Sequence, residues 1–343
     1  ILEKSHGGFW NYPVDDYSYI RNFYYPTSSM FSHLRNSLRE LIWNYGSSQE
    51  IINKKIAYLV GVPNQNIIAL SGAAQIYPII RNIFSGKKVC YPDITFGEYS
   101  RIFPNAIKYA DMFNEGKTLE ESIIESDLVI LINPNNPSGK IYSTESIDSF
   151  AKKFPEKYFL IDESFIEYSN EESIINYLEK EPKNNVIVLK SLSKSHGIPG
   201  IRLGFVYTQN SEVFKKIYSN LPIWNLNSFA ENYMEIALKF RGELKDSFEK
   251  AKKDRDYLIS LLKEINYISK VYNSSGSFVS FKINDEDLAK DLTEYLLSNH
   301  NIYIKQLSNI GLDKSNYFRV ALVSKIKIDK LIKALKTFTP KKI

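Results

Sequence analysis

The stretch that decides the fold is Val186-Ile-Val-Leu-Lys-Ser-Leu-Ser-Lys-Ser-His-Gly-Ile-Pro-Gly-Ile-Arg-Leu-Gly-Phe-Val-Tyr207. An apolar, β-branched run begins at Val186 and a second apolar run begins at Leu203, so the residues between them are predicted to form a loop between two buried strands. Lys194 lies in that loop. In open α/β sheets ligands bind at the ends of strands, so this position favours a functional lysine.

Lys194 has the surroundings that a nucleophilic amine needs. A lysine partly removed from water has a lowered pKa and can form a Schiff base with an aldehyde. Ser191, Ser193 and Arg202 are suitable donors for a phosphate dianion. An amine beside a phosphate cradle is what pyridoxal 5'-phosphate requires. A lone lysine in a Gly/Ser loop would be a solvated surface residue, but the flanking strands and the motifs below favour the cofactor.

The strands on either side of this stretch indicate the fold class. Residues 128–132, 158–161 and 186–189 are near-continuous apolar runs, typical of strands buried on both faces of a largely parallel sheet covered by helices. Residues 67–70 predict a further strand, and residues 73–84 a helix. The part from residue 278 onward, where strands alternate with two helices, predicts a smaller α+β domain.

The length of 343 residues exceeds what one core usually supports, so we expect more than one domain. Residues 1–30 are predicted to form an ordered N-terminal arm, residues 31–240 a large cofactor-binding domain and residues 241–343 a small domain. Part of the N-terminal segment is expected to complete the small domain. A helical pattern from residue 227 to 262, interrupted at Gly242, is predicted to lead from one domain to the other.

Two motifs follow neighbouring strands and carry polar groups. In Asn133-Pro-Asn-Asn-Pro-Ser-Gly139 an Asn side chain can donate to a phenolate oxygen at the sheet edge, although a purely structural turn is an equally good interpretation. In Asp162-Glu-Ser-Phe165 the first carboxylate can pair with a protonated pyridine nitrogen. By itself that Asp would be a helix N-cap.

Two further stretches fit a phosphate-bearing planar ligand. Ser71-Gly-Ala-Ala-Gln75 follows a predicted strand and opens a helix, so its backbone N–H groups and the helix dipole can hold a phosphate. It is not a GxGxxG fingerprint, which argues against a nicotinamide cofactor. Phe96 and Tyr99 can offer an aromatic face to the ligand, or they are simply core residues.

The composition of the chain argues against several classes of protein function. The 44 basic and 39 acidic residues are interspersed without a basic stripe, so we predict no nucleic-acid binding. No segment predicts a membrane span or a signal peptide, and we predict no metal site. The single cysteine, Cys90, excludes an internal disulfide and indicates a buried thiol in a reducing cytoplasm. The chain does not begin with Met, so we expect it to be either a trimmed sequence or one domain of a longer polypeptide that is fused to another domain.

Taken together, these stretches resemble the fold type I pyridoxal-phosphate-dependent aminotransferases over nearly the whole chain. Within that family the sequence is most similar to the branch of histidinol-phosphate aminotransferases and threonine-phosphate decarboxylases. The segments that especially resemble the decarboxylase are His6-Gly-Gly8, Thr95-Phe-Gly-Glu-Tyr99, Pro222-Ile-Trp-Asn-Leu-Asn227 and Ile304-Lys-Gln-Leu-Ser-Asn309.

The resemblance implies a fold and a cofactor site. The fold is α/β, with a mixed, mostly parallel sheet in a large domain and a smaller α+β domain. Lys194 forms the Schiff base with pyridoxal 5'-phosphate, Asp162 pairs with the ring nitrogen and Asn136 contacts the ring oxygen. The cofactor-binding residues that it implies are Tyr45, Ala73, Ala74, Phe96, Asn136, Asp162, Ser191, Ser193, Lys194 and Arg202.

The resemblance also implies partners. Tyr45 matches a tyrosine that reaches the cofactor of a second subunit, which implies a homodimer with shared sites. Arg319 matches the arginine that binds the substrate carboxylate. The substrate-binding residues that it implies are His6, Asn227, Lys305 and Arg319.

The chain departs from the family pattern at several positions. Phe165 replaces a tyrosine whose hydroxyl lies near the ring oxygen, and Lys305 replaces an arginine. Val323 stands where a basic residue is frequent. Ser275-Gly-Ser277 stands where relatives often have an Asn that faces the ligand. These differences leave His6 and Lys305 as the residues expected to bind a substrate phosphate.

The predicted function is amino transfer between a small amine or amino acid bearing a phosphate or phosphonate and a 2-oxo acid. The first alternative is decarboxylation of an amino-acid phosphate, which would use the same residues. The second is a non-catalytic, cofactor-binding regulatory domain. The presence of Lys194, Asp162 and Arg202 together argues against a regulatory domain.

Overall fold

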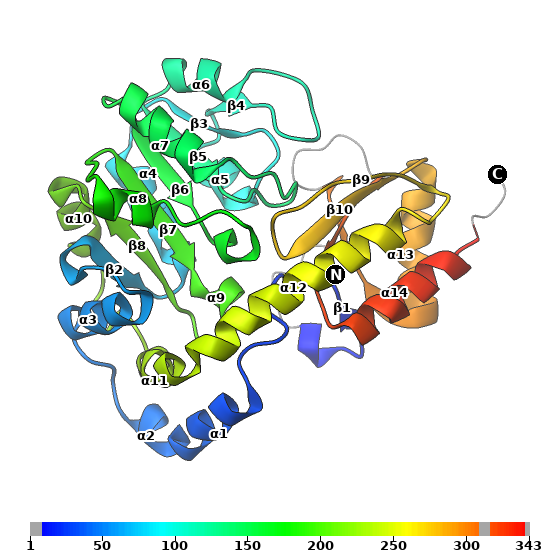
Figure 1. Ribbon diagram of the computed structural model, residues 1–343, viewed down its shortest axis with the longest axis horizontal. Helices are drawn as coiled ribbons and strands as arrows, with labels where there is room; N and C mark the ends of the chain where they lie inside the picture. Colours follow the sequence, from blue (N-terminus) through cyan, green and yellow to red (C-terminus); the bar gives the residue numbers. More distant parts are fainter. Residues whose placement is uncertain (1–8, 309–315, 340–343) are drawn as a thin grey trace.

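The computed structural model describes residues 9–308 and 316–339, and its large domain is built on a seven-stranded sheet (Figure 1). The strand order is β2-β8-β7-β6-β5-β3-β4. Neighbouring strands are parallel except at β8, which is antiparallel to both β2 and β7. The strands are β2 (Ile67–Leu70), β3 (Val89–Pro92), β4 (Ile107–Tyr109), β5 (Leu128–Ile132), β6 (Tyr158–Asp162), β7 (Val186–Ser191) and β8 (Gly204–Thr208). The predicted mixed, mostly parallel sheet is confirmed.

Apolar residues on both faces of every central strand explain why this sheet lies between two layers of helices. Along β5, Val129 and Leu131 belong to one hydrophobic cluster, whereas Ile130 belongs to the cluster on the opposite face. The helices of this domain are α3 (Gln49–Val60), α4 (Ile76–Ile83), α5 (Gly97–Ile102), α6 (Leu119–Glu125), α7 (Thr144–Lys153), α8 (Ile175–Lys180), α9 (Leu192–Ser195), α10 (Ser211–Tyr218) and α11 (Ser228–Ala237).

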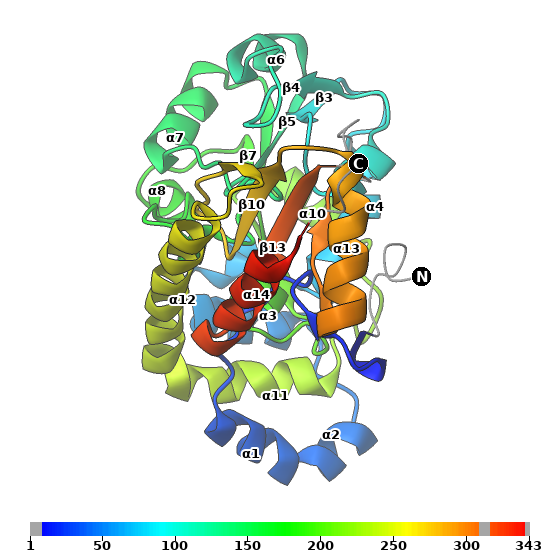
Figure 2. The ribbon, with the colours of Figure 1, turned by 90° about the vertical axis from the view of Figure 1, so that its right-hand side faces the viewer.

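The small domain contains a four-stranded antiparallel sheet in the order β12-β13-β10-β9. Its strands are β9 (Ile268–Val271), β10 (Phe278–Ile283), β12 (Lys305–Gln306) and β13 (Tyr317–Ala321). Helices α12 (Arg241–Leu262), α13 (Asp287–His300) and α14 (Lys325–Thr337) bury their apolar sides with this sheet in one cluster. Figure 2 shows α13 and α14 side by side over the sheet.

The N-terminal segment contacts both domains. Strand β1 (Asp15–Asp16) pairs in parallel with β11 (Ile302–Tyr303), and Tyr17 lies in the hydrophobic cluster of the small domain. Helices α1 (Ser28–Asn36) and α2 (Leu38–Trp43) then run along the lower edge of the large domain in Figure 1. The predicted domain limits at residues 30 and 240 remain predictions.

Two local expectations are wrong. The helical pattern breaks before Gly242, because α11 ends at Ala237 and Leu238–Phe240 form a 3-10 turn. Leu238 and Phe240 pack against the core of the large domain, which turns the chain there, and a glycine inside an exposed helix costs only about 1 kcal/mol. The stretch around Lys194, predicted as a loop, contains one helical turn, α9.

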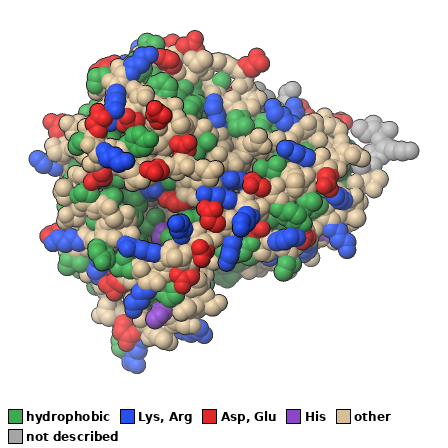
Figure 3. Space-filling model, in the orientation of Figure 1, with side chains coloured by type: hydrophobic (Ala, Val, Ile, Leu, Met, Phe, Trp, Pro, Cys, Tyr) green, Lys and Arg blue, Asp and Glu red, His purple; other side chains and the backbone are tan. Residues whose placement is uncertain are grey.

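The surface carries both signs of charge. On the face shown in Figure 3, Lys and Arg side chains are interspersed with Asp and Glu. Ion pairs between the two signs include those of Lys152 with Asp148 and Glu181. Cys90 is buried. None of the helices in the described part of the chain is long and apolar enough to cross a membrane.

Candidate active site

The sheet topology gathers the predicted cofactor residues at one edge. Strands β2, β3, β5, β6 and β7 all run in the same direction, so their carboxyl ends lie together, and β8 begins at that edge because it runs the opposite way. The residues placed there after the strands, or just before β8, are Ala73, Ala74, Phe96, Asn136, Asp162, Ser191, Ser193, Lys194 and Arg202.

Lys194 lies in the single turn of α9 and is partly buried. The main-chain oxygen of Lys194 accepts hydrogen bonds from the backbone amide of Asn22 (2.8 Å) and the Tyr168 hydroxyl (3.2 Å), which fix the backbone of the turn. Burial lowers the pKa of the Lys194 ammonium, and the nearby Arg202 guanidinium lowers it further. A larger neutral fraction of this amine makes it a better nucleophile at neutral pH.

Asp162 ends β6 and is only 5% exposed. Its Oδ1 accepts hydrogen bonds from the Ser164 backbone amide (3.1 Å) and hydroxyl (2.6 Å), and its Oδ2 accepts one from the Tyr99 hydroxyl (2.7 Å). Burial raises the pKa of this carboxyl above its usual value, and the Ser164 and Tyr99 donors offset only part of that rise. The same hydrogen bonds fix the orientation of a carboxyl group that can pair with a cationic ring nitrogen.

The phosphate cradle consists of a glycine turn, a hydroxyl and a guanidinium. Ser193 Oγ is buried and has no hydrogen-bond partner among the described residues, so an acceptor or donor from a ligand fits there. Gly72 has a φ of +74°, and a Cβ on it would lie 2.4 Å from Arg202 Nη2. Position 204 also requires glycine, because a Cβ on Gly204 would lie 2.8 Å from the backbone amide nitrogen of Ala73. These observations fit the phosphate of pyridoxal 5'-phosphate.

The two aromatic residues after β3 differ in role. Phe96 is 41% exposed just before α5, so its ring has a face available to a planar ligand. Tyr99 has no exposed surface and therefore offers no such face. Its hydroxyl instead holds Asp162, a contact that the sequence did not reveal.

Arg319 connects the small domain to the Asn-Pro turn. Its Nη1 donates to Asn136 Oδ1 (2.6 Å), and its Nη2 donates to the Ser18 carbonyl oxygen. With Oδ1 taken, the amide Nδ2 of Asn136 remains as the donor for a ring oxygen. Arg319 Nε is buried without a partner in the described structure, and burial lowers the pKa of Arg319 to about 10. The side chain therefore stays charged at neutral pH and can bind a carboxylate.

Lys305 lies directly opposite Arg319 in the antiparallel β12–β13 pair, and Ser280 lies opposite Arg319 on its other side. Residues that face each other on antiparallel strands point to the same face of the sheet. The Ser280 hydroxyl donates to the Pro137 carbonyl oxygen (2.6 Å), so this face is turned toward the Asn-Pro turn. Lys305 and Arg319 thus share the face next to the cofactor site.

The remaining predicted site residues lie apart. Asn227 caps α11 through its Oδ1 and donates from its Nδ2 to the Ile201 carbonyl oxygen (3.1 Å), so it supports the segment before Arg202. Its role in substrate binding remains a prediction. Tyr45 is 76% exposed and stacks on Trp224 with a centroid separation of 4.2 Å. His6 lies outside the described residues.

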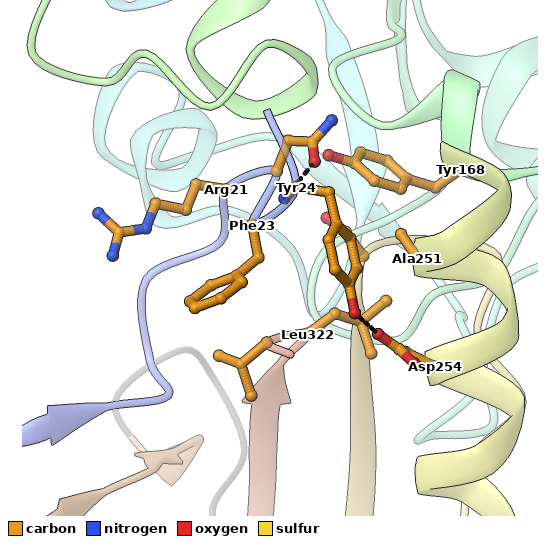
Figure 4. Close-up of a pocket in the computed structure, with 10 residues that line it drawn as sticks. Arg21, Phe23, Tyr24, Tyr168, Ala251, Asp254 and Leu322 are labelled. Carbon is orange, nitrogen blue, oxygen red and sulfur yellow. Dashed lines mark hydrogen bonds between the residues drawn. The ribbon is translucent and has the colours of Figure 1, made fainter. Parts of the chain in front are cut away.

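The N-terminal segment of residues 15–25 contributes to the candidate site, and the sequence did not indicate this contribution. In addition to the contacts of Ser18 and Asn22, Tyr24 donates its hydroxyl proton to Asp254 of α12, as Figure 4 shows. Between this segment, α12 and the end of β13 lies a cavity of about 10 Å³. A void of that size accommodates no substrate, so we interpret the region as packing that fixes the segment above Lys194.

Comparisons with known proteins agree with this geometry. Residues 31–335 match the family model of aminotransferase class I and II. A CMP-5'-(3-aminopropyl)phosphonate synthase from Streptomyces rubellomurinus is 26% identical over 98% of this chain, which spans only 54% of that relative's length. An L-serine phosphate decarboxylase from Campylobacter jejuni is 27% identical, and the match covers 87% of this chain and 80% of the length of that decarboxylase.

Among solved structures, a histidinol-phosphate aminotransferase from Clostridium acetobutylicum superposes with a TM-score of 0.83. It is 27% identical and covers 94% of this chain and 98% of its own. The matched family region contains the lysine, carboxylate and phosphate cradle described above. The chain therefore belongs to the class I and II aminotransferase family, whose members depend on pyridoxal 5'-phosphate.

Proposed function

We propose that this protein is an aminotransferase that moves an amino group between a small amine or amino acid bearing a phosphate or phosphonate and a 2-oxo acid. The observation that carries the proposal is the cross-strand pairing of Lys305 with Arg319. It puts two cationic side chains on the face beside Asn136, which matches a substrate with two anionic groups.

The residues of this chain have separate tasks in such a reaction. Bound pyridoxal 5'-phosphate supplies an electron sink for the substrate α-carbon. Arg319 orients the substrate carboxylate, and Lys305 attracts the distal anion. The free amine of Lys194 would take the proton from the substrate α-carbon as a general base. Asp162, which is only 5% exposed, would pair with the ring nitrogen of the cofactor.

Two relatives support a phosphate- or phosphonate-bearing substrate. The name of the Streptomyces relative refers to an aminopropyl phosphonate, and that of the Campylobacter relative to serine phosphate. The second relative also favours decarboxylation as the alternative reaction, since it matches most of both chains. In that reaction the carboxylate of the substrate, instead of its α-hydrogen, would leave the α-carbon as carbon dioxide, and Lys194 would return a proton to that carbon. A non-catalytic regulatory domain fits less well, because Lys194, Asp162 and Arg202 all lie together at the sheet edge.

We also propose a homodimer with shared active sites, located in the cytoplasm. Tyr45 and its stacking partner Trp224 are exposed, and so are the apolar side chains Ile42, Trp43 and Ile223 on neighbouring segments. An apolar surface of this kind favours association with a second copy. The 54% coverage of the Streptomyces relative supports a further, fused domain.

The dimer has a direct test. Tyr45→Ala and Lys194→Ala variants are each expected to be weakly active or inactive, because each lacks one part of every shared site. Mixing them under conditions that exchange subunits should restore activity, since a hybrid dimer contains one site with both residues intact. A mixture no more active than its components would contradict the sharing of sites.

The reaction type has a direct test as well. Holoenzyme is incubated with candidate phosphate- or phosphonate-bearing amines and with amino-acid phosphates, and pyridoxamine 5'-phosphate and carbon dioxide are measured separately. Formation of pyridoxamine 5'-phosphate without carbon dioxide supports amino transfer. Release of carbon dioxide without that product would replace our proposal by decarboxylation. A protein that stays colourless with added cofactor would contradict both.

A further inference from the structure

We propose that Tyr99 is a positioning residue for the cofactor, whose buried hydroxyl holds the Asp162 carboxylate as the ionised partner of the ring nitrogen. The inference rests on the use of pyridoxal 5'-phosphate and is independent of which substrate the enzyme takes. Tyr99 was an aromatic-face candidate in the sequence, and only the structure shows that its hydroxyl is the functional group.

The hydrogen bonds of Asp162 are divided between its two oxygens. Oδ1 accepts both the backbone amide and the hydroxyl of Ser164, so both of its lone pairs are used. Oδ2 accepts only the Tyr99 hydroxyl, at 2.7 Å, among the hydrogen bonds of the described residues. One lone pair of Oδ2 therefore remains for a cation, and Tyr99 fixes the direction in which it points.

The position of Tyr99 is itself fixed by packing. Its ring has no exposed surface and meets the ring of Tyr77 edge-on, with a centroid separation of 5.3 Å and an interplanar angle of 82°. Its backbone amide donates to the carbonyl oxygen of Phe96, the N-cap residue of α5 (3.1 Å). The start of α5 thus carries both the exposed ring of Phe96 and the buried hydroxyl that holds the carboxylate.

Charge explains why this hydroxyl matters. Burial raises the pKa of Asp162, and a protonated carboxyl would be a poor partner for a cationic ring. Hydrogen bonds from Ser164 and Tyr99 offset part of that rise by stabilising the ionised form. Loss of the Tyr99 donor removes the support from the oxygen that has a free lone pair, whereas loss of the Ser164 hydroxyl leaves a backbone donor on Oδ1.

The test uses Tyr99→Phe, which keeps the ring and removes one hydroxyl. Apoenzyme is titrated with pyridoxal 5'-phosphate and, in parallel, with an analogue in which carbon replaces the ring nitrogen, and dissociation constants are measured by equilibrium dialysis. Because a hydrogen bond to a charged group is worth more than a neutral one, we expect Tyr99→Phe to weaken binding of the natural cofactor by about tenfold. Binding of the analogue should change by less than about twofold, since it has no cation for Asp162 to hold.

The matched control is Tyr109→Phe, which removes a buried tyrosine hydroxyl on β4 of the large-domain sheet, one that donates to the Ile130 carbonyl oxygen (3.0 Å). It should leave both dissociation constants unchanged. Ser164→Ala is expected to weaken binding of the natural cofactor less than Tyr99→Phe does. If Tyr99→Phe weakens binding of both compounds equally, or weakens binding of neither, the proposal is overturned. A wild-type chain that binds neither compound would overturn the cofactor assignment itself, which separates the two failures.

Discussion

The two halves of the candidate active site are built in different ways. The cofactor half lies on the large domain, where the candidate residues stand at or next to strand ends along one edge of a single sheet. The substrate half combines Lys305 of β12 and Arg319 of β13 with Ser18 of the N-terminal segment, which precedes Arg319 by 301 residues. Among the described residues, Arg319 reaches the large domain through its hydrogen bond to Asn136.

The difference shows which parts of an enzyme site follow from local sequence. Parallel strands place their carboxyl ends together whatever the sequence of the loops, so a short motif after each strand is enough to assemble the cofactor half. The substrate half depends on how two sheets dock against each other. The variants below separate the two halves, because a change in one should leave the properties of the other intact.

The largest effect is expected in the cofactor half. Lys194→Ala removes the proposed general base at the substrate α-carbon, whose loss alone typically costs about 10²- to 10⁴-fold in rate. Because the covalent link to the cofactor is lost as well, turnover should fall by about 10⁴-fold or more. Activity is measured in parallel with the fixation of cofactor by borohydride, which should disappear.

The control is Lys290→Ala, which changes an exposed lysine on α13. It should retain both turnover and borohydride fixation. Full activity of Lys194→Ala would rule out the assigned role and remove the basis for dividing the site into two halves.

The next effect belongs to the substrate half. Arg319→Lys keeps the charge but loses the planar guanidinium that donates to Asn136 and Ser18. We expect kcat/KM for the 2-oxo acid to fall by about 10- to 100-fold, as for the loss of one partner of a buried charge pair. The dissociation constant of pyridoxal 5'-phosphate should change little. A loss confined to cofactor binding would mean that Arg319 belongs to the other half.

A smaller and more selective effect is expected at Lys305. Lys305→Gln removes one charge from the face shared with Arg319, so KM for a phosphate-bearing amino donor should rise by about tenfold. KM for an unphosphorylated 2-oxo acid should stay nearly constant. Lys270→Gln, an exposed lysine on β9 of the same sheet, is the control. Equal effects of the two variants would argue against a distal anion site.

The smallest effect concerns the stability of the cofactor half. Burial lowers the pKa of His196 to about 4, below its usual value of 6.5, and its Nδ1 lies 2.9 Å from the Tyr233 hydroxyl. Between those two pH values the unfolded chain binds a proton that the folded protein does not, so the free energy of unfolding falls as pH drops from 7 to 5. Urea unfolding at pH 7 and pH 5 should show a smaller drop in the free energy of unfolding for His196→Phe than for the wild-type protein. An identical drop would show that His196 does not contribute to acid sensitivity.

The sequence predicted the cofactor half in some detail. The motifs at Asn136, Asp162 and Lys194 were recognisable because each follows a strand whose apolar run is unmistakable. The glycine turn before Ala73 was recognisable as well. The sequence did not show that Tyr99 binds Asp162, because burial of an aromatic ring and the direction of its hydroxyl depend on packing with Tyr77.

By itself, then, the sequence determined the alternation of strands and helices and the mostly parallel sheet, and it predicted Lys194 as the lysine that binds the cofactor. Periodicity and strand-end motifs are local properties, and local chemistry decides them. Only the tertiary structure decided that Ser18 and Asn22 reach Arg319 and Lys194, that Asn227 donates to the Ile201 carbonyl oxygen, and that the helical pattern breaks before Gly242. These features depend on contacts between segments up to 301 residues apart, where the free energy of packing outweighs any local preference.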